Sequence, residues 1–307
     1  MAIGMQLAGT EPDLLHALGP VLDALKAEGL PVELEGHRGW ARWGNARRRW
    51  VAGNGVESAR AGTILWAPSA EEVERVLSRW PQGRVFAAQS LAGDPLREHP
   101  HVTVVPRIVP DTFYPPGLDA DVFGVTQRFH LESRPRLIYF GGYSDGRALT
   151  RLLHVARRLL SLEGELILMD SMAVRASLAP VVQHLGLTEQ VVFVPALTDA
   201  ECAGLCLGAD LILAVDSEST PRAAITAALA TGTPVVAQYS PVNEALLGPA
   251  ALWVYAEDED LWVKAATKAL EAEPVREELS RRALEVTGPW RQSESVSEWL
   301  SALRGSF

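Results

Sequence analysis

Short apolar runs alternate with longer amphipathic segments along the chain, which predicts strands alternating with helices. In the first half, apolar residues recur at helical spacing between Leu14 and Leu25, and Ser69 can cap a second helix. The predicted strands of this half are Ile3–Leu7, Pro31–Leu34, Thr63–Trp66, Arg84–Ala88 and Val102–Val105. This alternation indicates the α/β class.

The second half repeats the pattern with a more regular spacing. A helix is predicted over Arg147–Leu162, and two or three helices follow from Asp258 onward. The predicted strands are Leu137–Phe140, Leu166–Met169, Val191–Val194, Leu211–Val215, Val235–Ala237 and the edge strand Trp253–Tyr255. Runs that are apolar at successive positions are typical of parallel strands covered by helices on both faces. We therefore expect a second, parallel sheet.

A proline-rich stretch separates the two halves. It contains Pro106, Pro110, Pro115 and Pro116. Prolines at this density exclude regular helix and central strand, and we expect a polar connection from there to about Arg136. We therefore predict two Rossmann-like domains, 1–116 and 117–307, and the last helix could pack back on the N-terminal domain.

Composition and charge narrow the class of protein. The chain has 307 residues, of which 48% are apolar and 21% charged, and such ordinary globular usage excludes disorder and fibrous repeats. Its net charge of −10 is the opposite of what a general nucleic-acid binder needs. Two cysteines are too few for a disulfide framework, and neither an 18-residue apolar run nor a signal peptide is present. We expect a soluble, cytoplasmic protein without a nucleic-acid partner.

One candidate binding loop follows the first strand of the second half. In a doubly wound sheet, ligands bind where strands end. Residues Phe140–Arg147 lead from a strand into a helix, and Gly141 and Gly142 allow backbone amides to approach a ligand closely. The helix start and the Arg147 guanidinium favour a phosphate. A tight turn without a ligand is the alternative.

A second candidate loop, Asp216–Arg222, also runs from a strand into a helix. Thr220 is predicted as the N-cap and Pro221 as the first helical residue, which leaves free N–H groups at the helix start. Just outside it, the Glu218 carboxylate can accept hydrogen bonds from sugar hydroxyls. A capped helix start that binds nothing is the alternative.

The segment Arg38–Trp50 concentrates arginine and tryptophan. It contains Arg38, Arg42, Arg47, Arg48 and Arg49 together with Trp40, Trp43 and Trp50. This pairing suits sugar stacking, an anionic acceptor or a membrane surface. The alternative is a solvent-exposed helix face whose tryptophans pack inward.

The remaining candidates for metal binding or hydrolysis are weak. Cys202 and Cys206 lie four residues apart on a predicted helix, and no histidine has a matching spacing, which favours buried thiols over a metal site. The seven histidines form no pair with metal-site spacing, and neither a GxSxG nor a P-loop motif is present. Hydrolases and NTPases of those types are therefore excluded.

Three segments, taken in order, resemble the retaining GT-B glycosyltransferases known as glycosyl transferases group 1. Val102–Pro115 is similar to the crossing between that family's two domains, and Val191–Asp210 to a stretch of its donor domain. Glu218–Ala237 is similar to the segment with the family's E-x7-E motif, and Glu244 falls near the glutamate of the following loop. The resemblance implies a GT-B-like fold, two Rossmann-like domains with a cleft between them.

The resemblance also implies a donor site in the C-terminal domain for a nucleotide-diphosphate sugar, which is a substrate rather than a cofactor. By position, Arg147 matches the family's phosphate-binding lysine, Glu218 the first glutamate of the motif, near the sugar hydroxyls, and Thr226 the second, which holds the ribose. Base recognition would use backbone groups near Pro195 and Leu197. The implied donor-binding residues are Gly141, Gly142, Arg147, Pro195, Leu197, Ser219, Thr220, Pro221, Arg222 and Thr226.

Catalysis and the acceptor are implied in the same way. The resemblance assigns catalytic roles to Glu218 and to Gln89, which stands where the family often has a histidine. The acceptor would lie on the N-terminal domain, and its expected contacts are Gly9, Thr10, Arg42 and Trp43. Transfer would retain the sugar's configuration and need no metal, because helix N-termini and basic side chains neutralise the leaving diphosphate.

We therefore expect a hexosyltransferase whose acceptor is anionic or membrane-proximal, which would allow peripheral membrane contact. Departures from the family keep alternatives open: Gly142 replaces an arginine, Thr226 replaces a glutamate, and Ser219–Pro221 replaces Gly-Phe-Gly. One alternative is a catalytically inactive partner or regulatory subunit of another transferase. Another is a nucleotide-sugar epimerase or phosphorylase, although an epimerase needs further acid and base side chains.

Overall fold

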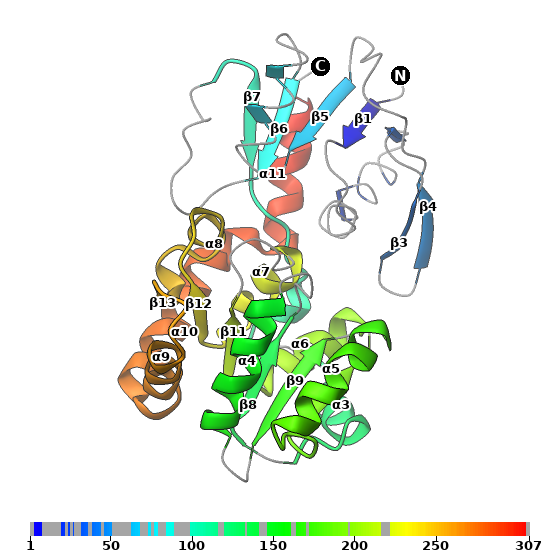
Figure 1. Cartoon of the computed structure of the whole chain (residues 1–307). Coiled ribbons are helices and arrows are strands. Elements are labelled where there is room, and N and C mark those ends of the chain that lie inside the picture. Colours follow the sequence, from blue (N-terminus) through cyan, green and yellow to red (C-terminus); the bar gives the residue numbers. More distant parts are fainter. Residues whose placement is uncertain are drawn as a thin grey trace. The chain divides into compact units, whose positions relative to one another are not determined.

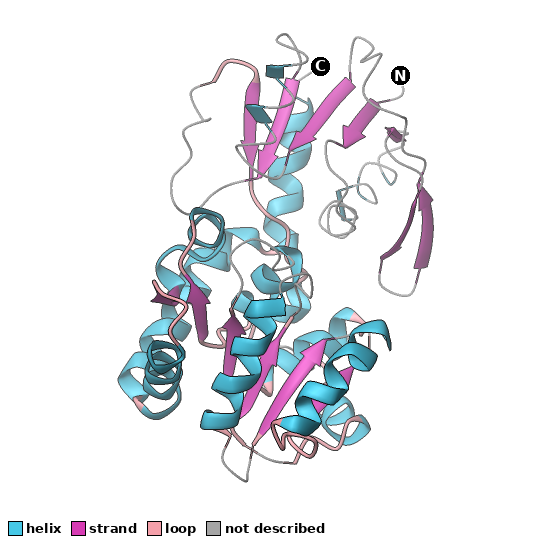
Figure 2. Cartoon of the chain, viewed as in Figure 1, coloured by secondary structure: helices cyan, strands magenta, loops and turns pink. Residues whose placement is uncertain are grey.

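Two parallel sheets, each with its own helices, form the framework of the chain (Figures 1 and 2). The computed structural model describes the backbone of residues 3–7, 20–21, 24, 27, 32–35, 39–43, 46–50, 63–67, 73–74, 77–78, 84–88, 99–115, 120–132, 134–140, 146–160, 164–169, 172–195, 197–215 and 222–304.

The first sheet has five parallel strands in the order β2-β1-β5-β6-β7. Their bounds are β1 Ile3–Leu7, β2 Val32–Glu35, β5 Thr63–Ala67, β6 Arg84–Ala88 and β7 Val102–Val105. All five lie close to the predicted positions. Four of them, β1, β5, β6 and β7, coincide with mainly apolar runs, whereas the edge strand β2 alternates apolar and acidic residues.

The last helix, α11 (Gln292–Arg304), packs on this first sheet. The Trp299 ring stacks on the Phe86 ring, with their centroids 5.7 Å apart and the planes inclined by 18°. The Trp299 Nε1–H donates to the carbonyl oxygen of Pro106 at 2.9 Å. Both rings are buried, so α11 completes the core beside β6 and β7.

The arginine- and tryptophan-rich segment forms an antiparallel hairpin of β3 (Gly39–Trp43) and β4 (Ala46–Trp50). The helical alternative for this segment is therefore wrong. The two residues between the strands, Gly44 and Asn45, match the length of a tight hairpin connection. Aromatic residues also favour strands over helices.

The second sheet has six parallel strands in the order β10-β9-β8-β11-β12-β13. Their bounds are β8 Arg136–Tyr139, β9 Glu165–Met169, β10 Val191–Val194, β11 Leu211–Ala214, β12 Val235–Gln238 and β13 Ala251–Val254. In chain order this is 3-2-1-4-5-6, the arrangement of dinucleotide-binding Rossmann folds. The order reverses between β8 and β11, which pair through Leu211 with Leu137 and Ile212 with Ile138.

Helices connect and cover these six strands (Figure 2). They are α4 Gly146–Leu159, α5 Met172–His184, α6 Asp199–Leu207, α7 Arg222–Ala230, α8 Pro241–Leu247, α9 Glu259–Glu271 and α10 Glu273–Thr287. Short 3₁₀ turns are found at Asp111–Phe113, Gly248–Ala250 and Gly288–Trp290. The core between sheet and helices is apolar and includes Trp262 of α9, whose side chain is fully buried.

One helix was not expected. The connection predicted as irregular between the proline-rich stretch and Arg136 contains α3 (Val122–Arg128), which packs against α6. Asp121 caps α3, its Oδ1 accepting from the Gly124 N–H at 2.8 Å. Gly204 of α6 allows the two helices to approach so closely that a Cβ there would lie 2.4 Å from the carbonyl carbon of Asp121.

Contacts divide the chain into two compact units. The first comprises Met1–Val109 and Pro289–Phe307, and the second Pro110–Gly288. The predicted domains, 1–116 and 117–307, remain a prediction, because contacts do not test where independently folding domains begin. None of the helices within the described ranges is long and apolar enough to cross a membrane.

Candidate functional site

The two candidate loops follow neighbouring strands of the second sheet. One loop follows β8 and the other follows β11, and these strands are hydrogen-bonded neighbours. In open α/β sheets, ligands bind at the carboxyl ends of the strands where the order reverses. The carboxyl ends of β8 and β11, about 75 positions apart in the sequence, therefore lie at the edge where this fold binds ligands.

Several predicted site residues lie outside the described residues. They are Gly9, Thr10, Gln89, Gly141, Gly142, Glu218, Ser219, Thr220 and Pro221. Their proposed roles stay predictions.

The helices that follow the two loops are described. Helix α4 begins at Gly146, and Arg147 is an exposed residue of its first turn. Helix α7 begins at Arg222, directly after the second loop. Both helices begin after the carboxyl ends of β8 and β11, and the dipole of a helix favours an anion at its start.

Three other predicted donor residues, Pro195, Leu197 and Thr226, differ in how far they are exposed. Pro195 is exposed just after β10, and Leu197 is partly buried two residues later. Thr226 lies in α7 with only 4% of its surface exposed. Their contacts with a nucleotide remain predictions.

Arg151 is a residue of this edge that the sequence analysis missed. Its side chain is 7% exposed, and Nη1 donates to the carbonyl oxygen of Val215 and to Gln238 Oε1, each at 3.3 Å. Its Nη2 also lies 3.2 Å from Glu257 Oε2. The guanidinium therefore joins the ends of β11 and β12 to the segment after β13. The available signal was a charge among the apolar positions of a helix, four residues after Arg147.

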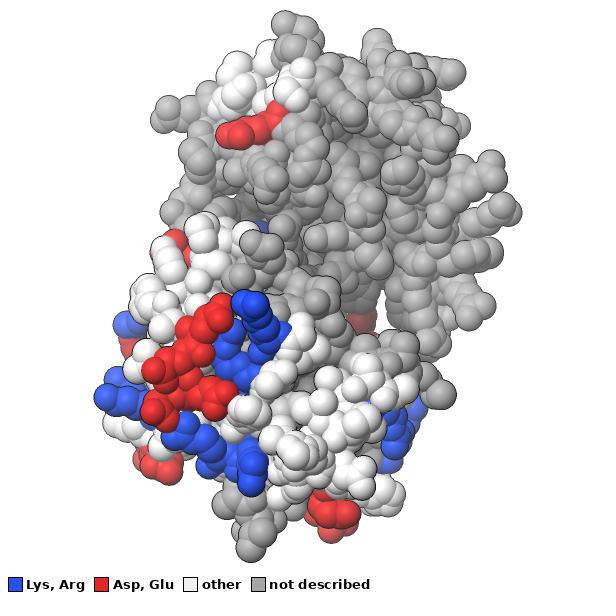
Figure 3. All heavy atoms as spheres, in the orientation of Figure 1, with Lys and Arg blue, Asp and Glu red and all other residues white. Residues whose placement is uncertain are grey.

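Two further polar pairs continue along α4 and α9. His154 Nδ1 lies 2.8 Å from Glu259 Oε1, and Arg158 Nη1 donates to Asp260 Oδ1 at 2.6 Å. Figure 3 shows the corresponding surface, where acidic side chains gather in one patch with basic side chains beside it. Together with Arg151 and Glu257, these pairs link α4 to α9 and to the segment after β13.

Aromatic residues gather after the last two strands. Tyr239 follows β12 and Tyr255 follows β13, with their ring centroids 4.7 Å apart, and Trp253 meets Tyr239 edge-on at 5.8 Å. The Tyr239 hydroxyl donates to Glu244 Oε2 at 3.1 Å, and this hydrogen bond raises the pKa of the Tyr239 hydroxyl. The carboxylate of Glu244, the residue matched to the loop glutamate, is therefore hydrogen-bonded to the Tyr239 hydroxyl.

The predicted acceptor residues Arg42 and Trp43 lie in the hairpin. Arg42 pairs with Arg47 across the strands, Trp40 with Arg49, and Trp43 with Ala46.

The cysteines follow the thiol prediction. Both lie in α6, where Cys206 is buried and Cys202 partly buried. A hydrogen bond with Cys202, together with burial, raises the pKa of the Cys206 thiol well above its ordinary value. In the part of the chain that the structure describes, no group of three or more His, Cys, Asp or Glu side chains could hold a metal ion.

Sequence comparisons find no relative. No family model matches the chain, and neither does any curated protein sequence.

Solved structures, in contrast, match over the full length. A glycosyltransferase from Rickettsia africae is similar with a TM-score of 0.72 at 10% identity, covering 99% of this chain and 98% of that one. WaaG, a glycosyltransferase of lipopolysaccharide biosynthesis, gives 0.68 at 13% identity, covering 99% and 100%. HepE of Anabaena, in complex with UDP and glucose, gives 0.62 at 12% identity, also covering 99% and 100%. The chain therefore has the fold of these glycosyltransferases, the GT-B fold.

Proposed function

We propose that the chain is a glycosyltransferase that moves a sugar from a nucleotide-diphosphate donor to an acceptor. The observation that carries this proposal is the reversal of strand order between β8 and β11, the two strands that precede helices α4 and α7. The carboxyl edge of a sheet at such a reversal suits a nucleotide with a diphosphate. The same fold in HepE, solved with UDP-glucose, supports UDP as the first nucleotide to test.

The donor would be held by residues on both helix starts. Arg147 and Arg222 would bind the diphosphate, with the backbone amides of Gly141, Gly142 and Ser219–Pro221. Glu218 would accept hydrogen bonds from the sugar hydroxyls. Thr226 would face the ribose, and the backbone near Pro195 and Leu197 would meet the base.

The proposed chemistry needs no protein nucleophile. The acceptor hydroxyl attacks the anomeric carbon from the face that the diphosphate leaves. A new bond forms between the acceptor oxygen and the anomeric carbon, while the bond between that carbon and the bridging oxygen of the diphosphate breaks. The proton of the acceptor hydroxyl passes to the departing phosphate oxygen. Positive helix ends and arginines would stabilise the leaving charge without a metal, while Gln89 would hydrogen-bond near the reacting carbon.

The acceptor would bind the first unit, at Gly9, Thr10 and the hairpin. The concentration of arginine in this hairpin supports an anionic acceptor, because guanidinium groups bind phosphate and carboxylate through paired hydrogen bonds. Trp43 would add an aromatic contact of the kind that sugars and membrane interfaces use.

A thermal-shift series tests the donor site. We expect UDP or another nucleoside diphosphate, and its sugar conjugate, to raise Tm by roughly 5–10 °C at about 100 times Kd. Glu218→Ala should abolish the extra shift given by the sugar, and Arg147→Ala should weaken the shift given by the diphosphate itself. Arg157→Ala is the matched control, because Arg157 is exposed in the last turn of α4, far along the helix from its start.

The outcomes separate the hypotheses. A shift with one base that Arg147→Ala removes and Arg157→Ala keeps would support the donor site and identify the nucleotide. If UDP, GDP, ADP, dTDP and their sugar conjugates all leave Tm unchanged, the glycosyltransferase proposal is rejected. The inactive partner of another transferase would then be the better hypothesis.

A further inference from the structure

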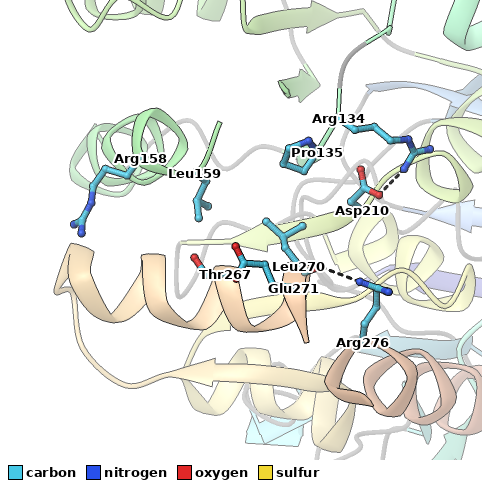
Figure 4. Close-up of a pocket in the computed structure, with 9 residues that line it drawn as sticks. All are labelled: Arg134, Pro135, Arg158, Leu159, Asp210, Thr267, Leu270, Glu271 and Arg276. Carbon is cyan, nitrogen blue, oxygen red and sulfur yellow. Dashed lines mark hydrogen bonds and ion pairs between the residues drawn. The ribbon is translucent and has the colours of Figure 1, made fainter. Parts of the chain in front are cut away.

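A concave site lies in the same unit as the proposed donor site. It is a pocket of about 470 Å³, within the range of about 300–1,000 Å³ typical of small-molecule sites (Figure 4). Its walls are Arg134, Pro135, Arg158, Leu159, Asp210, Thr267, Leu270, Glu271 and Arg276. Nothing in the proposed transfer reaction uses these residues.

The pocket opens at the opposite edge of the sheet from the donor loops. Arg134 and Pro135 directly precede β8, and Asp210 directly precedes β11, so they stand at the amino ends of those strands. Leu159 is the last residue of α4, whose first turn contains Arg147. A ligand bound here therefore cannot be the donor, because parallel strands separate their amino and carboxyl ends by the full strand length.

One end of the pocket has a guanidinium, Arg276, that forms no ion pair with any carboxylate in the part of the chain that the structure describes. Asp210 is satisfied by Arg134, with which it forms an ion pair, and by the Arg136 N–H, which donates at 2.8 Å. Arg276 Nη1 instead donates to a neutral acceptor, the carbonyl oxygen of Leu270, at 2.8 Å. In Figure 4, Arg134, Asp210 and Arg276 lie at this end and Arg158 at the other, where Asp260 pairs with it.

The region between the two ends combines hydroxyl-binding and apolar groups. The Thr267 hydroxyl and the Glu271 carboxylate line it, and both can hydrogen-bond to ligand hydroxyls. Leu159, Leu270 and Pro135 give it apolar walls, against which the C–H face of a sugar ring can pack. Glu271 is exposed and negatively charged, so it repels a bare phosphate, whereas the hydroxyls of a sugar can donate to its carboxylate. A ligand that has hydroxyls beside Glu271 is therefore favoured over simple phosphate.

We propose that this pocket binds a small phosphorylated sugar, with the phosphate on Arg276 and the sugar hydroxyls on Thr267 and Glu271. The ligand is bound separately from the donor. Because the pocket contacts the end of α4 and the amino ends of β8 and β11, its occupant and the donor bind to the same three elements from opposite ends.

Calorimetric titration of the full chain tests this site, with glucose 6-phosphate as the probe and glucose and inorganic phosphate as comparators. We expect saturable binding of glucose 6-phosphate, weaker binding of phosphate and none of glucose. Arg276→Gln should weaken binding of glucose 6-phosphate about tenfold or more, because it removes a charge-assisted hydrogen bond while an amide can still donate to Leu270. Thr267→Val, which removes one hydroxyl, should weaken binding less.

Two variants serve as controls. Arg282→Gln changes an arginine of the same helix that lies outside the pocket and pairs with Glu278, so it should leave binding unchanged. Arg147→Ala, at the proposed donor site, should also leave it unchanged, which separates this site from that one. Absence of saturable binding at millimolar glucose 6-phosphate, equal binding by Arg276→Gln, or loss of binding in Arg147→Ala would each overturn the proposal, whatever the outcome with nucleotides.

Discussion

At the scale of single residues, Glu201 shows how hydrogen bonds at the start of a helix stabilise the ionised form of a carboxyl group. The Thr198 N–H donates to Glu201 Oε2 at 2.9 Å, and in return the Glu201 N–H donates to the Thr198 hydroxyl oxygen at 3.3 Å. Arg128 of α3 also forms an ion pair with Glu201. The Thr198 backbone hydrogen bond, aided by the Thr198 hydroxyl and Arg128, outweighs burial and lowers the pKa of Glu201.

The lowered pKa makes the stability of this helix start depend on pH. A carboxyl whose folded pKa is depressed adds stability above its unfolded value, about 4.3, and loses it as the pH falls through the folded value. Glu201→Gln keeps an N3 side chain able to accept from Thr198 but removes the charge. We therefore expect the Tm difference between wild type and Glu201→Gln to be largest at pH 6 and to shrink toward pH 3. Glu277→Gln, at an exposed position of α10, supplies the background, and a difference that stays constant with pH would contradict the prediction.

At the scale of elements, strands were easier to predict than short helices. The strands of both sheets lie close to the apolar runs that mark them, because a central strand is buried on both faces. Helix α3 has no comparable apolar pattern in the sequence. Among its seven residues only Val125 is buried, while Phe123 is 73% exposed. Its packing depends on Gly204, some 80 positions away, and no local pattern contains that contact.

Part of the candidate site could likewise be predicted from local sequence patterns. The two loops could be recognised because each follows an apolar run and precedes a helix, and the parallel pairing of β8 with β11 then relates them. The charge of Arg151 among apolar helix positions is visible in the sequence, but its contacts are not, since its partners Val215, Gln238 and Glu257 come from three separate segments. The hairpin was misjudged because arginine and tryptophan at these spacings fit a helix face as well as two paired strands.

The close approach of α3 and α6 leads to a test with two glycines. In an open helix, Gly→Ala stabilises by up to about 1 kcal/mol. At Gly204 the new Cβ would meet the backbone of Asp121, and overpacking of this kind costs about 1–3 kcal/mol. We expect Gly204→Ala to lower the free energy of unfolding and Gly146→Ala, where nothing described lies within 4 Å of the new Cβ, to leave it unchanged or raise it. Urea unfolding measures both, and equal stability of the two variants would contradict the prediction.

At the scale of the whole molecule, the chain passes between its two units twice. The outgoing segment at Val109 and the returning segment at Trp290–Gln292 lie side by side, with the Val109 N–H donating to the Trp290 carbonyl at 2.8 Å and the Gln292 N–H to the Val109 carbonyl at 2.9 Å. Within the second unit, the Tyr114 hydroxyl donates to the carbonyl oxygen of Thr287 at 2.6 Å. The second unit is thus continuous in sequence, whereas the first is assembled from two separate segments.

This difference predicts how the pieces behave alone. Residues 110–288 contain the whole six-stranded sheet with its covering helices, so we expect this fragment to unfold in one cooperative transition in urea. Residues 1–109 lack α11 and the Trp299 ring that covers Phe86, so we expect them to show no such transition until 289–307 is joined to them. Cooperative unfolding of 1–109 alone, or its absence in 110–288, would contradict this account.

The route of the chain also sets an order of events during synthesis. Trp299 follows its partner Pro106 by 193 residues, so at about 5–20 residues per second the ribosome makes one roughly 10–40 s after the other. By the time Trp299 is added, the ribosome has synthesised every residue of the second unit, while Phe86 still lacks the ring that stacks on it. The half of the protein that begins first is therefore the last to be finished.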